Sequence, residues 1–166
     1  AGSSDDTTGL TPTYIVASGG STATSGDYKI HTFTSNANFT VCSIGNATGG
    51  PNKVDYMVIA GGGGSGGSAG VATGSGGGGA GGYRESSGAE TGCYTVSPRG
   101  AAPAAAITVS AQAYPIVIGA GGNSGGSGYG NTGGSGSTSS GLGISSAGGG
   151  GGSGYNAPAS GSGGSG

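Results

Sequence analysis

Charge and large side chains are both scarce in this sequence. Only 6% of its 166 residues are charged, Trp is absent, and there are two Phe and one His. The four basic residues are scattered and outnumbered by six acidic ones, which is too little positive charge to hold nucleic acid or an anionic lipid surface. No apolar run approaches the roughly 18–20 residues that a membrane-spanning helix requires. We therefore expect no nucleic-acid partner and no membrane insertion.

Cysteine and histidine are too rare for a metal site. Such sites usually need three or four clustered ligands, and Cys42, Cys93 and His31 are the only Cys and His residues. The two cysteines either form one disulfide in an oxidising compartment or remain as two small buried hydrophobic residues, because the sequence does not fix the distance between them. We expect no metal and no other cofactor.

Catalytic patterns are present but lack their partners. A G-x-G-x-x-G match at Gly61, Gly63 and Gly66 has no following helix to receive a pyrophosphate. The G-x-S-x-G pattern occurs twice, at 63–67 and 122–126, so it discriminates little in such a composition. A serine nucleophile would need a base, and the single histidine lies in a stretch with strand alternation. We expect a non-enzymatic protein.

Glycine is what the sequence does contain, at 47 positions. Ordering it is costly, because fixing each backbone residue costs roughly 1–2 kcal/mol and glycine loses the most freedom. The chain nevertheless lacks the high net charge of a disordered protein. Stepping by three from Gly61 to Gly82 gives glycine at seven of eight positions, and Gly119 to Gly128 repeat this spacing before the phase slips at Gly130. A polyproline-II helix has three residues per turn, so this spacing would let backbones touch and bond laterally.

The rest of the chain is typical of short antiparallel strands separated by Gly, Asn and Ser turns. The run 54–60 is the most apolar, and we expect it to be a central strand. Pro115 lacks an amide hydrogen, which suits a strand start or a sheet edge. The stretch 18–27 is expected to be a turn. The expected strands are 13–18, 27–34, 38–44, 54–60, 94–97, 106–111 and 114–120.

The predicted fold is all-β, an antiparallel β-sandwich-like base with polyglycine-II or polyproline-II-type segments and no significant helix. Residues 1–27 are expected to form an N-terminal strand or connector. Residues 28–166 are expected to form the glycine-rich β domain, with glycine tracts at 61–82 and 119–166. We expect the chain to be truncated at its C-terminus.

The segment Tyr83–Gly100 differs from its neutral surroundings, because it holds two of the four basic residues and two tyrosines. Exposed Tyr and Arg are favoured in recognition surfaces, although a solvated loop that maintains solubility explains the segment equally well. Two further tyrosines are isolated among glycines. The candidate receptor-binding residues are Tyr83, Arg84, Glu85, Tyr94, Arg99, Tyr129 and Tyr155.

The order of several blocks resembles the glycine-rich domains of bacteriophage tail fibres and related virion structural proteins, particularly marine ones. The blocks are YKIHTFTSNANFTV, VDYMVIAGGGG, GGGGAGGYRES, ITVSAQAYPIVIGAGG and ISSAGGGGGSGY, which together span most of the chain. The resemblance implies a protein of the virion surface, outside the cell, with glycine tracts that emerge from strand ends. In similar adhesins at fibre tips, polyglycine-II helices stack into a sandwich and the loops between them bind the host, a role that would fall here to the glycine tracts and to 83–100.

The leading hypothesis is therefore a tail-fibre or adhesin module that attaches to a host-surface saccharide or outer-membrane protein. We expect it to act within a homo-oligomer, with a trimer favoured, and together with other virion proteins. A head-fibre or capsid decoration protein with a purely structural role is the first alternative. An ice-binding glycine-rich protein is the second.

Overall fold

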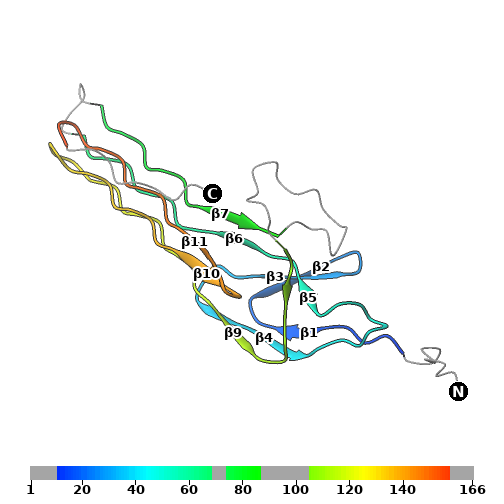
Figure 1. Ribbon diagram of the computed structural model, residues 1–166. Coiled ribbons are helices and arrows are strands. Elements are labelled where there is room, and N and C mark those ends of the chain that lie inside the picture. The colour runs from blue at the N-terminus through cyan, green and yellow to red at the C-terminus, as the bar shows by residue number, and fades with distance from the viewer. Residues whose placement is uncertain (1–10, 69–73, 87–104, 158–166) are drawn as a thin grey trace, which may run out of the picture.

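The structure, a computed structural model, describes residues 11–68, 74–86 and 105–157, which form eleven strands and no helix. The molecule is elongated, with a β-rich base at one end and a bundle of extended glycine segments reaching away from it (Figure 1). All sheets are antiparallel, so the all-β expectation is confirmed. The strands are β1 (Val16–Ser18), β2 (Ser21–Ser25), β3 (Tyr28–Thr32), β4 (Ala37–Ser43), β5 (Lys53–Val54), β6 (Met57–Ile59), β7 (Tyr83–Glu85), β8 (Ile107–Thr108), β9 (Ala113–Ile116), β10 (Ser139–Gly141) and β11 (Ile144–Ser146).

The base is built on a three-stranded sheet in the order β1-β4-β9. Strand β4 alternates as its sequence predicts, with Phe39 and Val41 buried and Cys42 exposed. Phe39 lies edge-on to the rings of His31 and Phe33, with centroids 5.2 and 6.4 Å away. Phe39 and Val41, with Ala17 and Val109, make up the buried core, and Phe33 packs against it while partly exposed.

Strand β9 closes the sheet at one edge, which is where Pro115 was expected. The neighbouring Tyr114 packs against the core. Its hydroxyl oxygen accepts the Ser110 N–H at 2.8 Å. The Ser110 hydroxyl and this N–H lower the pKa of the phenol below its ordinary value of 10.0.

The stretch 18–27 contains a strand, so the expectation of a turn throughout it was wrong. Strand β2 pairs with β3 along its whole length, from Ser21 opposite Thr32 to Ser25 opposite Tyr28. The turn is only two residues long and has a positive φ at its first position, Gly26, which is the pattern of a type II′ hairpin. Ser and Thr residues are compatible with a pleated strand as well as with a turn. Pairing with β3 makes this stretch a strand.

The apolar run 54–60 is not the single central strand that we expected. It divides into the end of β5, which pairs only with β8, and β6, which pairs only with β7. Between them, the Tyr56 N–H donates to the Ser86 hydroxyl oxygen at 3.0 Å instead of to a neighbouring strand. The outward side chains of β6, Met57 and Ile59, are 63% and 56% exposed, so this run is not covered on both faces.

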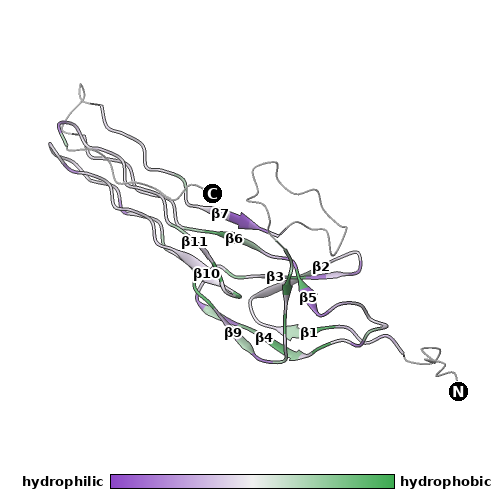
Figure 2. Ribbon diagram, in the orientation of Figure 1, coloured by the Kyte–Doolittle hydropathy of each residue, from purple (hydrophilic) through white to green (hydrophobic). Residues whose placement is uncertain are grey.

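Five strands continue directly into five glycine-rich segments, which we number I to V in chain order. Segment I (60–68) follows β6, and segment II (74–82) leads into β7. Segment III (119–128) follows β9, segment IV (130–138) leads into β10, and segment V (147–155) follows β11. Figure 2 shows that hydrophobic residues lie mainly in the base, whereas the bundle is pale throughout.

Lateral backbone hydrogen bonds hold the bundle together, and they repeat every third residue. Segment I lies at the centre and bonds to all four others. Its N–H groups donate to segments II and IV, and its carbonyls accept from segments III and V. One such row is formed by Gly61, Gly64 and Gly67, which donate to Ser137, Gly134 and Asn131 at 2.7–3.0 Å.

The period of three decides where a side chain fits. A Cβ on Gly64 would overlap the Asn123 carbonyl of segment III, whereas a Cβ on Gly62 would have no atom nearer than 3.6 Å. The same position of the repeat accordingly holds Ser65, which is exposed like Gly62, and the half-buried Ser68. The backbone hydrogen bonds and the close contacts thus follow the three-residue period that a polyglycine-II-type segment requires.

The stretch 138–147, which interrupts the glycine spacing, forms a hairpin. Strands β10 and β11 pair from Ser139 opposite Ser146 to Gly141 opposite Ile144. The two residues between them, Leu142 and Gly143, both have positive φ, at 55° and 81°, as a type I′ turn requires. The hairpin thus turns the chain from segment IV into segment V.

Two glycine substitutions test the close backbone contacts. Neither Gly64 nor Gly62 has a positive φ, so alanine is allowed locally at both. Gly64→Ala should destabilise the protein by about 2 kcal/mol or more, because the methyl group overpacks the bundle. Gly62→Ala, the matched control, should be neutral or stabilising by about 0.4–1 kcal/mol. Equal unfolding free energies for the two variants in urea would contradict the packing described.

Amide hydrogen exchange should follow the same period in segment I. The N–H groups of Gly61 and Gly64 are bonded, whereas those of Gly62 and Ser65 have no backbone partner among the described residues. We expect the first pair to exchange at least about tenfold more slowly than the second pair. Exchange resolved by NMR measures this directly, and uniform free-peptide rates along 60–68 would show that the segment is not bonded.

Candidate functional site

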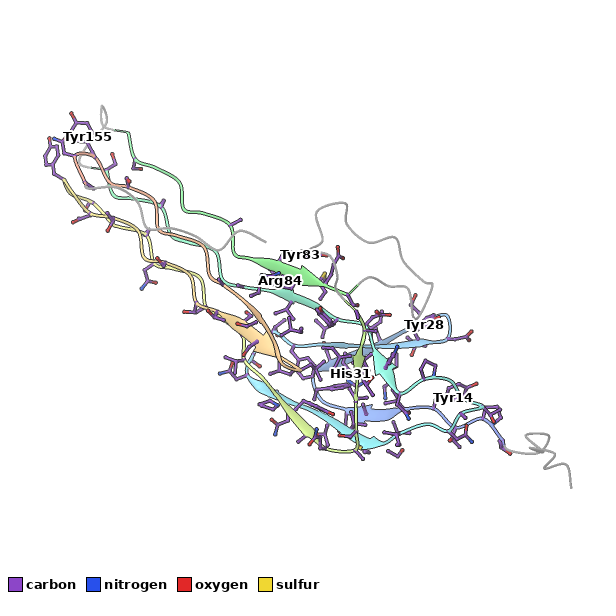
Figure 3. The ribbon with its side chains drawn as sticks, viewed as in Figure 1. Tyr14, Tyr28, His31, Tyr83, Arg84 and Tyr155 are labelled. Atoms are coloured by element: carbon purple, nitrogen blue, oxygen red, sulfur yellow. The ribbon has the colours of Figure 1, made fainter. Side chains whose placement is uncertain are left out.

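The candidate recognition residues lie at two places on the molecule. Tyr155 is at the far end of the bundle, and Tyr83 and Arg84 are where the bundle joins the base (Figure 3). Tyr129 lies beside Tyr155, since their ring centroids are 5.7 Å apart. The far end of the bundle, residues 126–131 and 154–157, is called the tip below.

One of the two tip turns reverses the chain between segments III and IV. It has positive φ at Gly126, Gly128 and Gly130, with 67°, 132° and 73°, conformations that glycine adopts at little cost. The Asn131 side chain holds the turn, because its Nδ2 donates to the Ser127 carbonyl at 3.0 Å. Tyr129 lies within this turn.

The other tip turn follows segment V. The Ala157 N–H donates to the Gly154 carbonyl at 3.1 Å, and Asn156 has a positive φ of 57°. A positive φ at the third turn residue is the pattern of a type II turn, in which Asn is one of the favoured residues. Tyr155 occupies the second position.

Backbone hydrogen bonds join these two turns to each other and to segment I. The Gly130 N–H donates to the Tyr155 carbonyl at 2.8 Å, and the Tyr155 N–H donates to the Gly67 carbonyl at 3.3 Å. The Gly128 N–H donates to the Ser68 carbonyl at 3.3 Å. The residues on either side of Tyr129 are therefore both anchored.

The two tyrosine rings form an exposed aromatic pair, the tip tyrosine pair. Their planes meet at 54°, and Tyr129 and Tyr155 are 67% and 40% exposed. A ring pair of this kind contributes about 0.5–1.5 kcal/mol beyond the area it buries. The sequence predicted both residues as recognition candidates, and the structure brings them together.

The bundle around the tip tyrosine pair carries no formal charge. The described stretches 56–68, 74–82 and 105–157 contain no Asp, Glu, Lys, Arg or His. Hydroxyl and amide groups supply the polarity near the tip, from Ser127, Asn131, Thr132, Ser153 and Asn156. The tip therefore offers aromatic faces and neutral hydrogen-bonding groups.

At the junction of bundle and base, Tyr83, Arg84 and Glu85 form a strand, so the expectation of a loop beginning at Tyr83 was wrong. These residues pair with β6. The Tyr83 hydroxyl donates to Glu85 Oε2 at 2.8 Å, and Glu85 is only 6% exposed. Arg84 points the other way and is exposed. Glu85 is thus part of the interior of the junction, and Arg84 presents the exposed charge.

The junction also contains a polar pair that the sequence did not indicate. Ser86 is fully buried, and its hydroxyl donates to Asp55 Oδ1 at 2.6 Å while accepting the Tyr56 N–H. The second carboxylate oxygen, Oδ2, is buried without a hydrogen-bond partner among the described residues. Ser86 lies about thirty residues from both partners, so no local motif could reveal the pair.

The remaining candidates are only partly placed. Tyr94, Arg99 and Cys93 lie outside the described residues. Cys42 is a free, exposed thiol, so the alternative of a buried hydrophobic residue is wrong for this cysteine. Its pairing with Cys93 stays a prediction.

Within the part of the chain that the structure describes, no three His, Cys, Asp or Glu side chains gather where they could hold a metal ion. No helix in the described ranges is long and apolar enough to cross a membrane.

Comparison with known proteins identifies the family of this chain. The fold is that of an all-β protein with laterally bonded glycine segments. Residues 34–166 match the family described as a glycine-rich domain, and because this is most of the chain, the protein belongs to that family. No curated protein and no solved structure gives a significant match.

Removal of the Ser86 hydroxyl should loosen the junction. Ser86→Ala leaves the Tyr56 N–H and one Asp55 oxygen without this partner, and loss of a buried partner costs about 1–3 kcal/mol. Ser145→Ala, at an exposed position of β11, serves as the control and should change the free energy of unfolding by less than about 0.5 kcal/mol. Chemical denaturation of both variants measures the difference, and equal stabilities would show that the Ser86 contacts contribute nothing.

Proposed function

We propose that this protein is a non-enzymatic virion structural protein of the tail-fibre or adhesin type, which attaches a phage to its host surface through the tip of the glycine bundle. The observation that carries the proposal is the placement of the tip tyrosine pair. A long bundle with almost no side chains ends in two exposed aromatic rings, at the point farthest from the base (Figure 3).

The architecture supports a projecting role. Five segments of about nine residues rise about 3.1 Å per residue, so the bundle extends roughly 25–30 Å beyond the strands. Lateral bonds from all three positions of the three-residue repeat in segment I tie the five segments together. A bonded bundle of this kind holds its end at a fixed distance from the base, which suits a module that presents a binding surface.

Exposed apolar side chains at the base support assembly into a homo-oligomer. Tyr14, Val16 and Ile44 are 67%, 54% and 46% exposed, and Val16 pairs with Ser43, the residue before Ile44. Neighbouring exposed apolar groups favour contact with another chain. A contact at the base leaves several tips free, and several weak tip contacts then act together.

A head-fibre or capsid decoration protein is the alternative with a purely structural role. Such a protein has no need for an aromatic pair that stays exposed at the far end of the bundle, since exposed tyrosine rings mainly add area for association. The tip tyrosine pair therefore favours attachment over decoration.

Binding to whole cells tests the proposed function. Fluorescently labelled protein is applied to a panel of bacterial strains, and we expect a narrow subset to be stained. Replacing both tip tyrosines, Tyr129→Ala with Tyr155→Ala, should reduce staining about tenfold or more. Met57→Ala, at a position of β6 that is 63% exposed and lies outside the proposed contact between copies, is the control for loss of an exposed apolar side chain. Staining that depends on Met57 alone, or no stained strain in the panel, would count against attachment through the tip.

A further inference from the structure

We propose that the tip tyrosine pair binds the apolar face of a neutral sugar ring, so that the ligand of the tip is an uncharged surface polysaccharide. This inference rests on the proposed attachment function and names its partner. It draws on ring geometry, local charge and the backbone bonds of the tip.

The shape of the pair suits one ring-sized ligand. Two planes inclined at 54° with centroids 5.7 Å apart form an open angle, not a closed stack. An aromatic face carries partial negative charge, and the axial C–H groups of a pyranose carry partial positive charge. One sugar ring can therefore lie against the more exposed Tyr129 while its edge meets Tyr155.

The surroundings favour a neutral and hydroxylated ligand. No described residue of the bundle is charged, so an acidic polysaccharide would lose hydration without gaining an ion pair. The side chains of Ser127, Thr132 and Asn156 are exposed near the turns and supply hydroxyl and amide groups. Sugar hydroxyls require both donors and acceptors, which these groups provide.

The tip is organised before any ligand arrives. The Gly130 N–H bond to the Tyr155 carbonyl links the two turns, and Gly128 is bonded to Ser68 of segment I. Within the turn that carries Tyr129, the Asn131 Nδ2 group also donates to the Ser127 carbonyl. A backbone fixed in this way loses little entropy on binding, so a small contact area can be sufficient.

A protein partner or a second copy fits the tip less well. Stable protein interfaces bury about 1,200–2,000 Å² in total, whereas two tyrosine side chains supply about 300–500 Å² at most. The rest of the tip is glycine and small polar residues. This area is appropriate for one or two sugar units, and repetition of units along a polysaccharide and of tips in an oligomer would raise the overall affinity.

The inference is tested on an array of purified bacterial polysaccharides, both neutral and acidic, with the 166-residue chain coupled to fluorescent beads. We expect binding to at least one neutral polysaccharide, and weaker binding to every acidic polysaccharide than to that one. Tyr129→Ala and Tyr155→Ala should each weaken binding about tenfold. Tyr129→Phe keeps the ring face and should stay within about threefold of the unchanged protein, and Met57→Ala, at an exposed position outside the tip, should bind as the unchanged protein does.

Several results would overturn the inference. These are the absence of binding to every neutral polysaccharide, a preference for acidic ones, and unchanged binding by the two alanine variants. A lower oligomeric state of the alanine variants in light scattering would assign the tip to a second copy instead. Folding of each variant is checked by its thermal unfolding, whose midpoint should fall by at most a few degrees because both side chains are exposed and only their ring contact is lost.

Cell staining separates failure of this inference from failure of the proposed function. The informative outcome is staining that requires the tip tyrosines, survives periodate oxidation of cell-surface sugars and is lost after protease treatment of the cells. This combination would identify the ligand as a protein, which overturns the sugar inference and leaves the attachment function intact. Complete absence of staining would remove the attachment function as well.

Discussion

Lateral hydrogen bonding between glycine backbones is the interaction on which this structure depends. The buried hydrophobic cluster is small, consisting of Ala17, Phe39, Val41 and Val109 with a few partly buried neighbours, and it lies entirely in the base. The bundle has no comparable apolar core to offset the entropy of ordering so much glycine. Its order comes instead from dense backbone bonding, which is possible because adjacent segments approach until their carbonyls touch the neighbouring Cα atoms. The same closeness excludes side chains from the interior.

The base is what makes the bundle possible. Each of the five segments extends a strand, and the antiparallel pairing of β6 with β7 and of β10 with β11 continues into the segments that follow or precede them. Pairing in the base therefore fixes the relative positions of the segment ends that join it. The buried Ser86–Asp55 contact lies where the base joins the bundle. There the run 54–60 changes its pairing partner from β8 to β7. At the opposite end, three backbone bonds fix the tip, so Tyr129 and Tyr155, the large side chains among its described residues, are held between anchored residues.

Local pattern was sufficient to predict much of this fold. Three features followed from local rules. The alternation in β4 reflects side-chain direction in a strand, the edge position of Pro115 reflects its missing N–H, and the three-residue glycine spacing reflects the turn of an extended helix.

The expectations that were wrong concerned residues whose structure depends on distant partners. Strand β2 is made of Ser, Thr and Ala, which occur equally in turns, and only pairing with β3 makes it a strand. The strand expected over 54–60 is interrupted where the Tyr56 N–H donates to the Ser86 hydroxyl. Glu85 is buried because it lies in β7, which pairs with β6. The sequence singled out Tyr129 and Tyr155 because they are isolated among glycines, but their adjacency arises from the bundle's topology.

The central position of segment I has a consequence for how the molecule is made. Segment I leaves a ribosome before all four of its neighbours, and two of these, III and V, are the donors to its carbonyls. Until residues near Tyr155 have been synthesised, the carbonyls of Gly61, Gly64 and Gly67 lack the N–H groups of segment V that they accept in the bundle. Contacts between such distant parts of the chain form late and slowly. The central segment is therefore made first and its neighbours are added around it later. The bundle can be complete only after the chain has been synthesised as far as segment V.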